Sequence, residues 1–248
     1  MAIQAYQADL HIHTVLSPCA EVEMIPSLIV AAAQQAGLDI IAIADHNSCE
    51  NADAVIEAAA GTGLRVLPGL EVQSVEGVHF LCLFDSLDSA ADMQEAVYAS
   101  LPDIPGAKKV IDEQLIVDSK DEFIRYCEKP ISLPTSMDID EVYERVNKLN
   151  GIIIPSHIDR QSTGMCGVLG MMPETPVFDA VEISANLTTD QARIEYSSIG
   201  DRPIFQNSDA HWLSMIGERR TLLHLEHRSV SEIHRACWRE NGRRVGNA

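Results

Sequence analysis

Imidazole and carboxylate side chains recur along this sequence at the ends of short apolar runs. His11 and His13 are separated by one residue, and on an extended segment two such side chains point to the same side. Asp209 and His211 have the same spacing, so each pair could reach one cation. The other members of the set are Asp9, Asp45, His46, Glu71, His79, His157 and Glu182. Mixed imidazole and carboxylate ligands that leave a position for water are typical of catalytic metal sites.

Each of these signals is weak when it stands alone. A histidine after a strand is usually a surface residue, and the Asp45-His46-Asn47 segment could equally cap a helix by satisfying its free amides. The number of such residues, nearly all at the ends of expected strands, favours a metal site. His224, His227 and His234 lack this context, and we expect them on the surface or in the core.

The six cysteines contain no CxxC pair, which argues against a zinc finger or a thioredoxin-type motif. We expect free thiols, and Cys82, within an apolar run, should be a small core residue. Cys19 lies six residues past His13 in a turn that begins at Ser17, and Cys166 lies in a glycine-bounded loop that could line the site.

The apolar runs alternate with helical patterns, which is typical of a parallel α/β sheet or barrel. In a barrel the carboxyl ends of the strands open onto one face, so residues far apart in the sequence would meet there. The expected helices are 26–36, 52–60, 139–149 and a stretch within 230–241. The expected strands are 40–44, 65–68, 77–83, 152–155, 180–183 and 203–205.

The bulk properties restrict the possible functions. The length of 248 residues suits one domain, with residues 85–136 as an insertion or excursion from it. The net charge of −19 should repel the phosphates of nucleic acid, so we expect duplex nucleic acid to be a poor partner. It does not exclude a short nucleotide or another small phosphate, since metal ions could supply positive charge locally. No signal peptide and no membrane span are visible, which predicts a cytoplasmic protein that does not enter membranes. The sequence leaves the oligomeric state open.

Five motifs, in order, resemble those of the PHP family, named for polymerase and histidinol phosphatase domains. They are DLHIHTVLSPC at 9–19, AIADHN at 42–47, PGLEV at 68–72, the histidine of IPSHIDR at 154–160, and NSDAH at 207–211. This resemblance implies a distorted (β/α)7 barrel, similar to a TIM barrel, with two or three divalent cations such as zinc, manganese or iron. It also implies the metal ligands, which would be His11, His13, Cys19, His46, Glu71, His79, His157, Asp209 and His211. Glu71 would bridge two cations, and Cys19 stands where the family usually has a histidine or an aspartate.

The activity that the resemblance implies is hydrolysis of a phosphoric ester in a small phosphorylated metabolite or nucleotide, by a hydroxide that bridges the metals. Asp45, together with Asp9, would orient histidine ligands. Arg160 is either a phosphate clamp or half of a surface salt bridge. His211 could serve as a general acid if it is not a ligand. The alternatives are a nuclease that trims 3′ ends and a non-catalytic metal-binding domain with a regulatory role.

Overall fold

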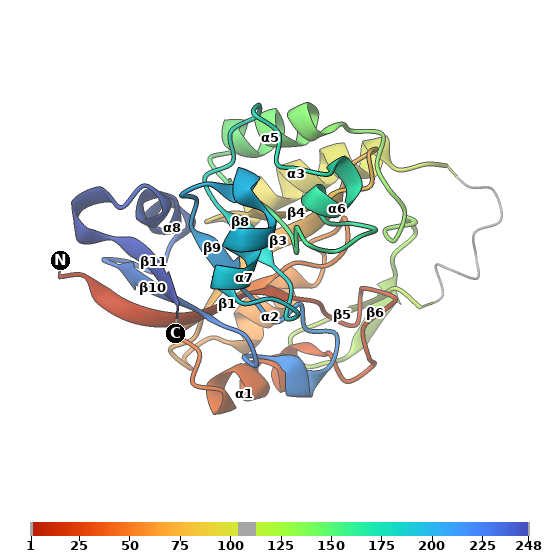
Figure 1. Ribbon diagram of the computed structural model, residues 1–248. Coiled ribbons are helices and arrows are strands. Elements are labelled where there is room, and N and C mark those ends of the chain that lie inside the picture. Colours follow the sequence, from red (N-terminus) through yellow and green to blue (C-terminus); the bar gives the residue numbers. More distant parts are fainter. Residues whose placement is uncertain (1, 104–112, 248) are drawn as a thin grey trace.

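A curled seven-stranded sheet forms the centre of the molecule (Figure 1). The computed structural model describes residues 2–103 and 113–247. The sheet has the strand order β11-β10-β1-β2-β3-β4-β7, and two further pairs of strands, β5-β6 and β8-β9, lie outside it. The strands are β1 (Gln4–Ile12), β2 (Ile40–Ile43), β3 (Arg65–Gln73), β4 (His79–Leu83), β5 (Leu115–Val117), β6 (Phe123–Tyr126), β7 (Ile152–Pro155), β8 (Val181–Ile183), β9 (Ile204–Gln206), β10 (Thr221–Leu225) and β11 (Arg244–Asn247).

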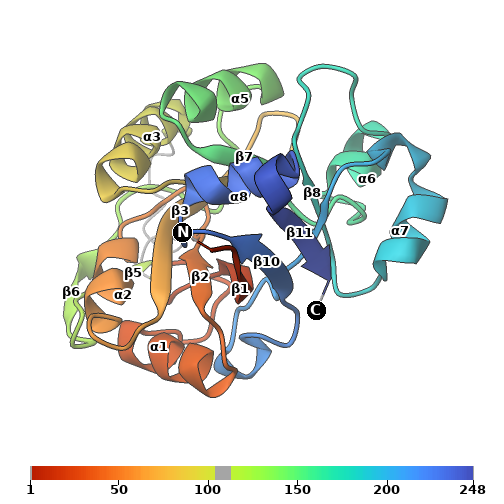
Figure 2. The same cartoon turned by 90° about the vertical axis from the view of Figure 1, so that its left-hand side faces the viewer.

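Helices cover the sheet on its outer side and close one of its ends. Figure 2 shows α1, α2, α3 and α5 around the outside, with α8 lying across the end at which β1 begins. The labelled helices are α1 (Pro26–Gln35), α2 (Ala52–Ala58), α3 (Leu87–Ser100), α5 (Ile139–Lys148), α6 (Met165–Leu169), α7 (Thr189–Glu195) and α8 (Val230–Cys237). None of the described helices is both long enough and apolar enough to span a membrane.

Both faces of the central strands are buried, which explains why they read as continuous apolar runs. Successive side chains of a strand point to opposite faces. In β2, Ile41 and Ile43 therefore pack outward with the helices, whereas Ile40 and Ala42 pack inward with residues of α8 such as Ile233. Because α8 and the inner core fill one end of the curled sheet, the polar residues gather at the opposite end.

The expectation of a parallel sheet is wrong at β4 and also at β10, which runs antiparallel to β1 and β11. β1, β2 and β3 are parallel, but β4 runs antiparallel to both β3 and β7. No helix separates β3 from β4. The chain reverses in a turn in which the Ser74 amide donates to the Val78 carbonyl, and Gly77 adopts a φ of 89° that suits glycine. The reversal places His79, the first residue of β4, at the same edge as the end of β3.

A complete (β/α)7 barrel is not what the described residues form, and this part of the fold prediction is corrected. β8 and β9 pair with each other as a separate parallel ladder. Two isolated links connect this pair to the main sheet at the polar end: the Ile158 amide donates to the Glu182 carbonyl, and Ile12 bridges Ala210. The ends of β7, β8, β9 and β1 are therefore neighbours, although their ladders are not continuous.

The segment 85–136, expected as an insertion, divides into two parts. α3 contributes Ala90, Met93 and Val97 to the outer core, and the β5-β6 pair lies apart from the main sheet. Asn51 connects this pair to the body, because its side chain accepts a hydrogen bond from the Val117 amide and donates one to the Leu115 carbonyl. Residues 104–112 of the segment lie outside the described residues.

Candidate metal centre

Glu71 lies at the centre of the polar end, with its side chain only 1% exposed. Imidazole nitrogens within 3.5 Å of its carboxylate oxygens come from His11, His13, His46, His79 and His157. Burial alone raises the pKa of Glu71, but the imidazoles of His79 and His11 outweigh this effect and hold the pKa well below its usual range. Glu71 is therefore an ionised carboxylate among nitrogen donors.

Asp209 supplies a second buried carboxylate on the other side of the first histidine pair. Its Oδ1 lies 3.3 Å from His11 Nε2 and 3.2 Å from His13 Nε2. Its Oδ2 forms an ion pair with Arg160 Nη2 at 2.5 Å. Burial raises the pKa of Asp209, but His11 and His13 lower it far more. The two carboxylates thus hold His11 and His13 between them.

Three residues at the polar end have a left-handed backbone conformation, which residues other than glycine rarely adopt. The φ angles are 48° at Asn47, 29° at His157 and 51° at Asp209. Such conformations cost on the order of 1–3 kcal/mol each and cluster at functional sites. At Asn47 the side chain compensates, since its amide donates to the carbonyls of Ile131 and Leu133.

Glu182 orients His11 from the side facing away from Glu71. His11 Nδ1–H donates to Glu182, with distances of 3.0 and 3.2 Å to the two oxygens. Glu182 also accepts hydrogen bonds from the His157 amide and from Asn207 Nδ2. A carboxylate on the outer nitrogen fixes the tautomer and directs Nε2 inward, as in many metal sites. The only sequence signal for this role of Glu182 is its place at the end of a predicted strand.

Asp45 does not touch the central cluster. Its carboxylate accepts hydrogen bonds from Ser17 Oγ at 2.6 Å, the Thr14 amide and Thr14 Oγ1. Ser17 Oγ in turn accepts from His13 Nδ1 at 3.0 Å. Asp45 therefore orients His13 through Ser17. Asp9 binds Ser208 and the Gly217 amide, so it supports the backbone next to Asp209 and contacts no histidine ring directly.

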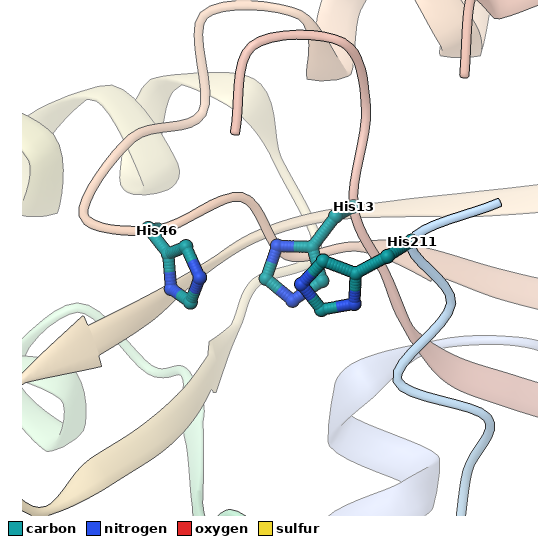
Figure 3. Close-up of side chains that lie close together, drawn as sticks. All are labelled: His13, His46 and His211. Atoms are coloured by element: carbon teal, nitrogen blue, oxygen red, sulfur yellow. The ribbon is translucent and has the colours of Figure 1, made fainter. Parts of the chain in front are cut away.

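A third group of imidazoles lies at the outer edge, where His13, His46 and His211 converge (Figure 3). His211 Nδ1–H donates to the Asp209 carbonyl at 2.8 Å, which leaves Nε2 free to face the group. The Cys19 thiol lies against His46 and His211. Burial raises the pKa of Cys19, but hydrogen bonds with His211 and His46 lower it to about 6.

The donor set fits divalent cations. Three groups of donors lie close enough together to share an ion: His11, His13 and Glu71; His46, Glu71 and His79; and His13, His46 and His211. His157 Nδ1 is buried and has no hydrogen-bond partner among the described residues. Every residue predicted as a ligand lies in or against this cluster. The histidines expected outside the site do lie elsewhere, with His234 paired with Asp179 and His224 beside Arg244. Cys166, whose loop could have lined the site, instead lies near Ser198.

The sequence model of the PHP domain matches residues 9–101. The resemblance to the PHP family is confirmed over this stretch. It includes the motifs that carry His11, His13, His46 and Glu71. No curated protein sequence matches the chain at a significant level.

Solved structures show the same fold over nearly the whole chain. The lesion-specific endonuclease Q from Pyrococcus furiosus matches with a TM-score of 0.74 at 19% identity, over 98% of this chain and 58% of its own. Endonuclease Q in complex with a 27-mer duplex that has an abasic lesion at the active site matches with a TM-score of 0.69 at 18% identity, over 97% of this chain. This chain thus spans 58% of the length of those proteins.

A candidate metal-dependent phosphoesterase from Bifidobacterium adolescentis matches with a TM-score of 0.56 at 20% identity, over 82% of this chain and 87% of its own. At these identities the likeness concerns the fold.

The expectation, drawn from the net charge, that duplex nucleic acid is a poor partner is wrong. A protein with this fold is known with a duplex at its active site. Net charge describes the whole surface, whereas affinity for phosphates depends on the charge where the phosphates lie. Bound cations at the polar end would change that local charge without altering the protein's own −19.

Proposed function

We propose that this chain is a metal-dependent hydrolase that cleaves phosphoric esters. The observation that carries the proposal is the pair of buried carboxylates, Glu71 and Asp209, with imidazoles packed around both. Buried charges need partners, and an ionised carboxylate among imidazole nitrogens is a good receptor for a cation. The PHP match and the fold shared with a phosphoesterase and an endonuclease support this reaction class.

In this proposal His11, His13, Glu71 and Asp209 hold one cation. Glu71, His79 and His157 hold a second, and His46, His211 and Cys19 hold a third. Zinc, manganese and iron are the candidates. When bound, such cations would stabilise negative charge on phosphoryl oxygens and favour loss of a proton from water.

The remaining roles belong to three residues around the metal ligands. The Arg160 side chain is 42% exposed and already binds an oxyanion, the carboxylate of Asp209, so it is the candidate for binding a substrate phosphate. The His211 side chain is partly exposed, and it is the candidate for protonating the leaving group wherever His211 is not a ligand. Asp45 acts as a positioning residue for His13 through Ser17.

The main candidate substrate is a small phosphorylated metabolite or nucleotide. The nuclease alternative is favoured by a specific observation, since endonuclease Q shares its fold with 98% of this chain. The two substrates place different demands on the rim, because a phosphomonoester needs one terminal phosphate pocket and a nucleic acid needs a path along its backbone.

The test compares both substrate classes on the metal-loaded chain. p-Nitrophenyl phosphate, a single-stranded oligonucleotide and a duplex with an abasic site are each incubated with manganese or zinc, using wild type and Glu71→Gln. We expect hydrolysis of at least one substrate by wild type and none by the variant. A wild type that binds metal but cleaves none of the three, or a variant as active as wild type, would contradict the proposal.

A further inference from the structure

The cluster has two chemically different ends. Around Glu71 and Asp209 the donors are imidazole nitrogens and carboxylate oxygens. At the edge formed by His46 and His211 a sulfur is present as well, from Cys19. Cys19 is exposed, whereas the other five cysteines, all within the described residues, are buried. A reactive donor thus lies at the open edge of a group of histidines that could share an ion without it.

Backbone and side-chain hydrogen bonds hold Cys19 in this place. The Ala20 amide donates to the Ser17 carbonyl and closes the turn. Ser17 Oγ accepts from the His46 amide at 3.2 Å, and the Glu21 amide donates to the His211 carbonyl at 2.8 Å. The turn is therefore attached on one side to the backbone of His46 and on the other to that of His211. These attachments keep Cys19 beside the two imidazoles.

We propose that the outer cation position is a soft-metal site, with Cys19 Sγ, His46 and His211 as ligands, which prefers zinc to manganese or magnesium. Thiolate ligands favour zinc, whereas carboxylate-rich positions accept harder cations. The cation displaces the thiol proton on binding, so the thiol does not have to be ionised beforehand. The positions around Glu71 and Asp209 would then accept manganese while the outer one does not.

This inference rests on the metal centre of the proposed function but not on its substrate. Its first test uses the exposure of Cys19. Metal-free wild type is treated with iodoacetamide alone, or after addition of zinc, cadmium, manganese or magnesium, and alkylation of each cysteine is followed by peptide mass spectrometry. The buried Cys49 and Cys82 serve as internal references. We expect zinc and cadmium to protect Cys19, and manganese and magnesium to leave it reactive.

A second measurement separates coordination from simple shielding. Cobalt bound by a thiolate gives a charge-transfer absorption in the near ultraviolet. We expect this band in wild type and in the control variant Cys166→Ser, and its loss in Cys19→Ser, with total cobalt content recorded in parallel.

Equal protection by manganese and zinc, no protection by zinc, or an unchanged band in Cys19→Ser would overturn the inference while leaving hydrolysis untouched. The alkylation result stands on wild type alone if Cys19→Ser does not fold. A wild type that binds no metal at all would instead overturn the metal centre of the proposed function, and this inference with it.

Discussion

Neighbouring histidines in the cluster are held in different protonation states by their surroundings. Burial lowers the pKa of His11, but Glu182, Asp209 and Glu71 raise it well above its usual value. Burial lowers the pKa of His13, and His211 and His46 lower it further, well below the usual range. His13 is therefore neutral and ready to bind a cation, whereas His11 must release a proton when a cation binds. Metal binding should accordingly release protons and weaken as the pH falls.

Glu182 offers a direct test of how outer hydrogen bonds support the ligands. The change Glu182→Gln keeps the shape but removes the charge that orients His11 Nδ1–H. We expect metal affinity, measured by calorimetric titration, to fall by about 10–100-fold, the usual effect of losing such a partner. The exposed Glu174→Gln is the matched control. Unchanged affinity in Glu182→Gln, with the fold intact, would show that His11 needs no such support.

Asp9 predicts a pH dependence of stability. Burial raises its pKa to about 6, although hydrogen bonds from Ser208 and Gly217 lower it. Because the folded pKa exceeds the unfolded value near 4, the stabilising contribution is complete below about pH 4 and is lost as the pH rises through about 6. The loss amounts to about 3 kcal/mol at most.

The measurement is urea unfolding of the metal-free protein at about pH 4 and about pH 7, for wild type and Asp9→Asn. Wild type should lose stability relative to the variant as the pH rises. A constant difference, or one of the opposite sign, contradicts this assignment.

At the scale of the elements, the ligands come together because strands that run in opposite directions end or begin at the same edge of the sheet. β1, β2 and β3 end there, and β4 begins there because it runs antiparallel. The convergence of His46, Glu71 and His157 could be predicted from apolar runs followed by polar residues, whereas β1, which carries His11, contains no such run. The reversal at β4 could not, because Gly77–Leu83 has the same apolar pattern in either direction. The separate ladder of β8 and β9 depends on long-range pairing that no local pattern encodes.

Other elements escaped prediction for local reasons. β10 and β11 have polar residues between apolar ones, so neither contains a continuous apolar run. In β10, buried and partly buried residues alternate. α3 has a weak amphipathic pattern, yet Ser86 caps it by accepting a hydrogen bond from the Ser89 amide. Asn51, which connects the β5-β6 pair to the body, gave no signal, because its importance lies in contacts far along the chain.

The burial of α3 in the outer core can be tested directly. Met93 is fully buried on the side of α3 that packs in this core, whereas Asp92 is exposed beside it. We expect Met93→Ala to lower the free energy of unfolding by about 2–5 kcal/mol. The control Asp92→Ala should change it by no more than about 0.5 kcal/mol. Urea denaturation measures both, and equal effects of the two changes would mean that α3 is peripheral.

At the scale of the whole molecule, the net charge predicts binding partners less well than the positions of the individual charged residues do. The net charge of −19 led to an expectation about nucleic acid that a structure of the same fold corrects. Much of the acidic excess need not face a substrate at all, and two of the acids, Glu71 and Asp209, are buried where cations would offset them. A cytoplasmic location and a single-domain organisation stay predictions.

The central claim is that residues from 9 to 211 form one receptor for cations, and Glu71 is its most connected member. The most direct measurement is the metal content per chain, by emission spectroscopy, of wild type, Glu71→Gln and the exposed control Glu57→Gln after dialysis against zinc or manganese. We predict about two or more cations in wild type and in Glu57→Gln, and loss of most of them in Glu71→Gln. Equal metal content in all three proteins would contradict the account.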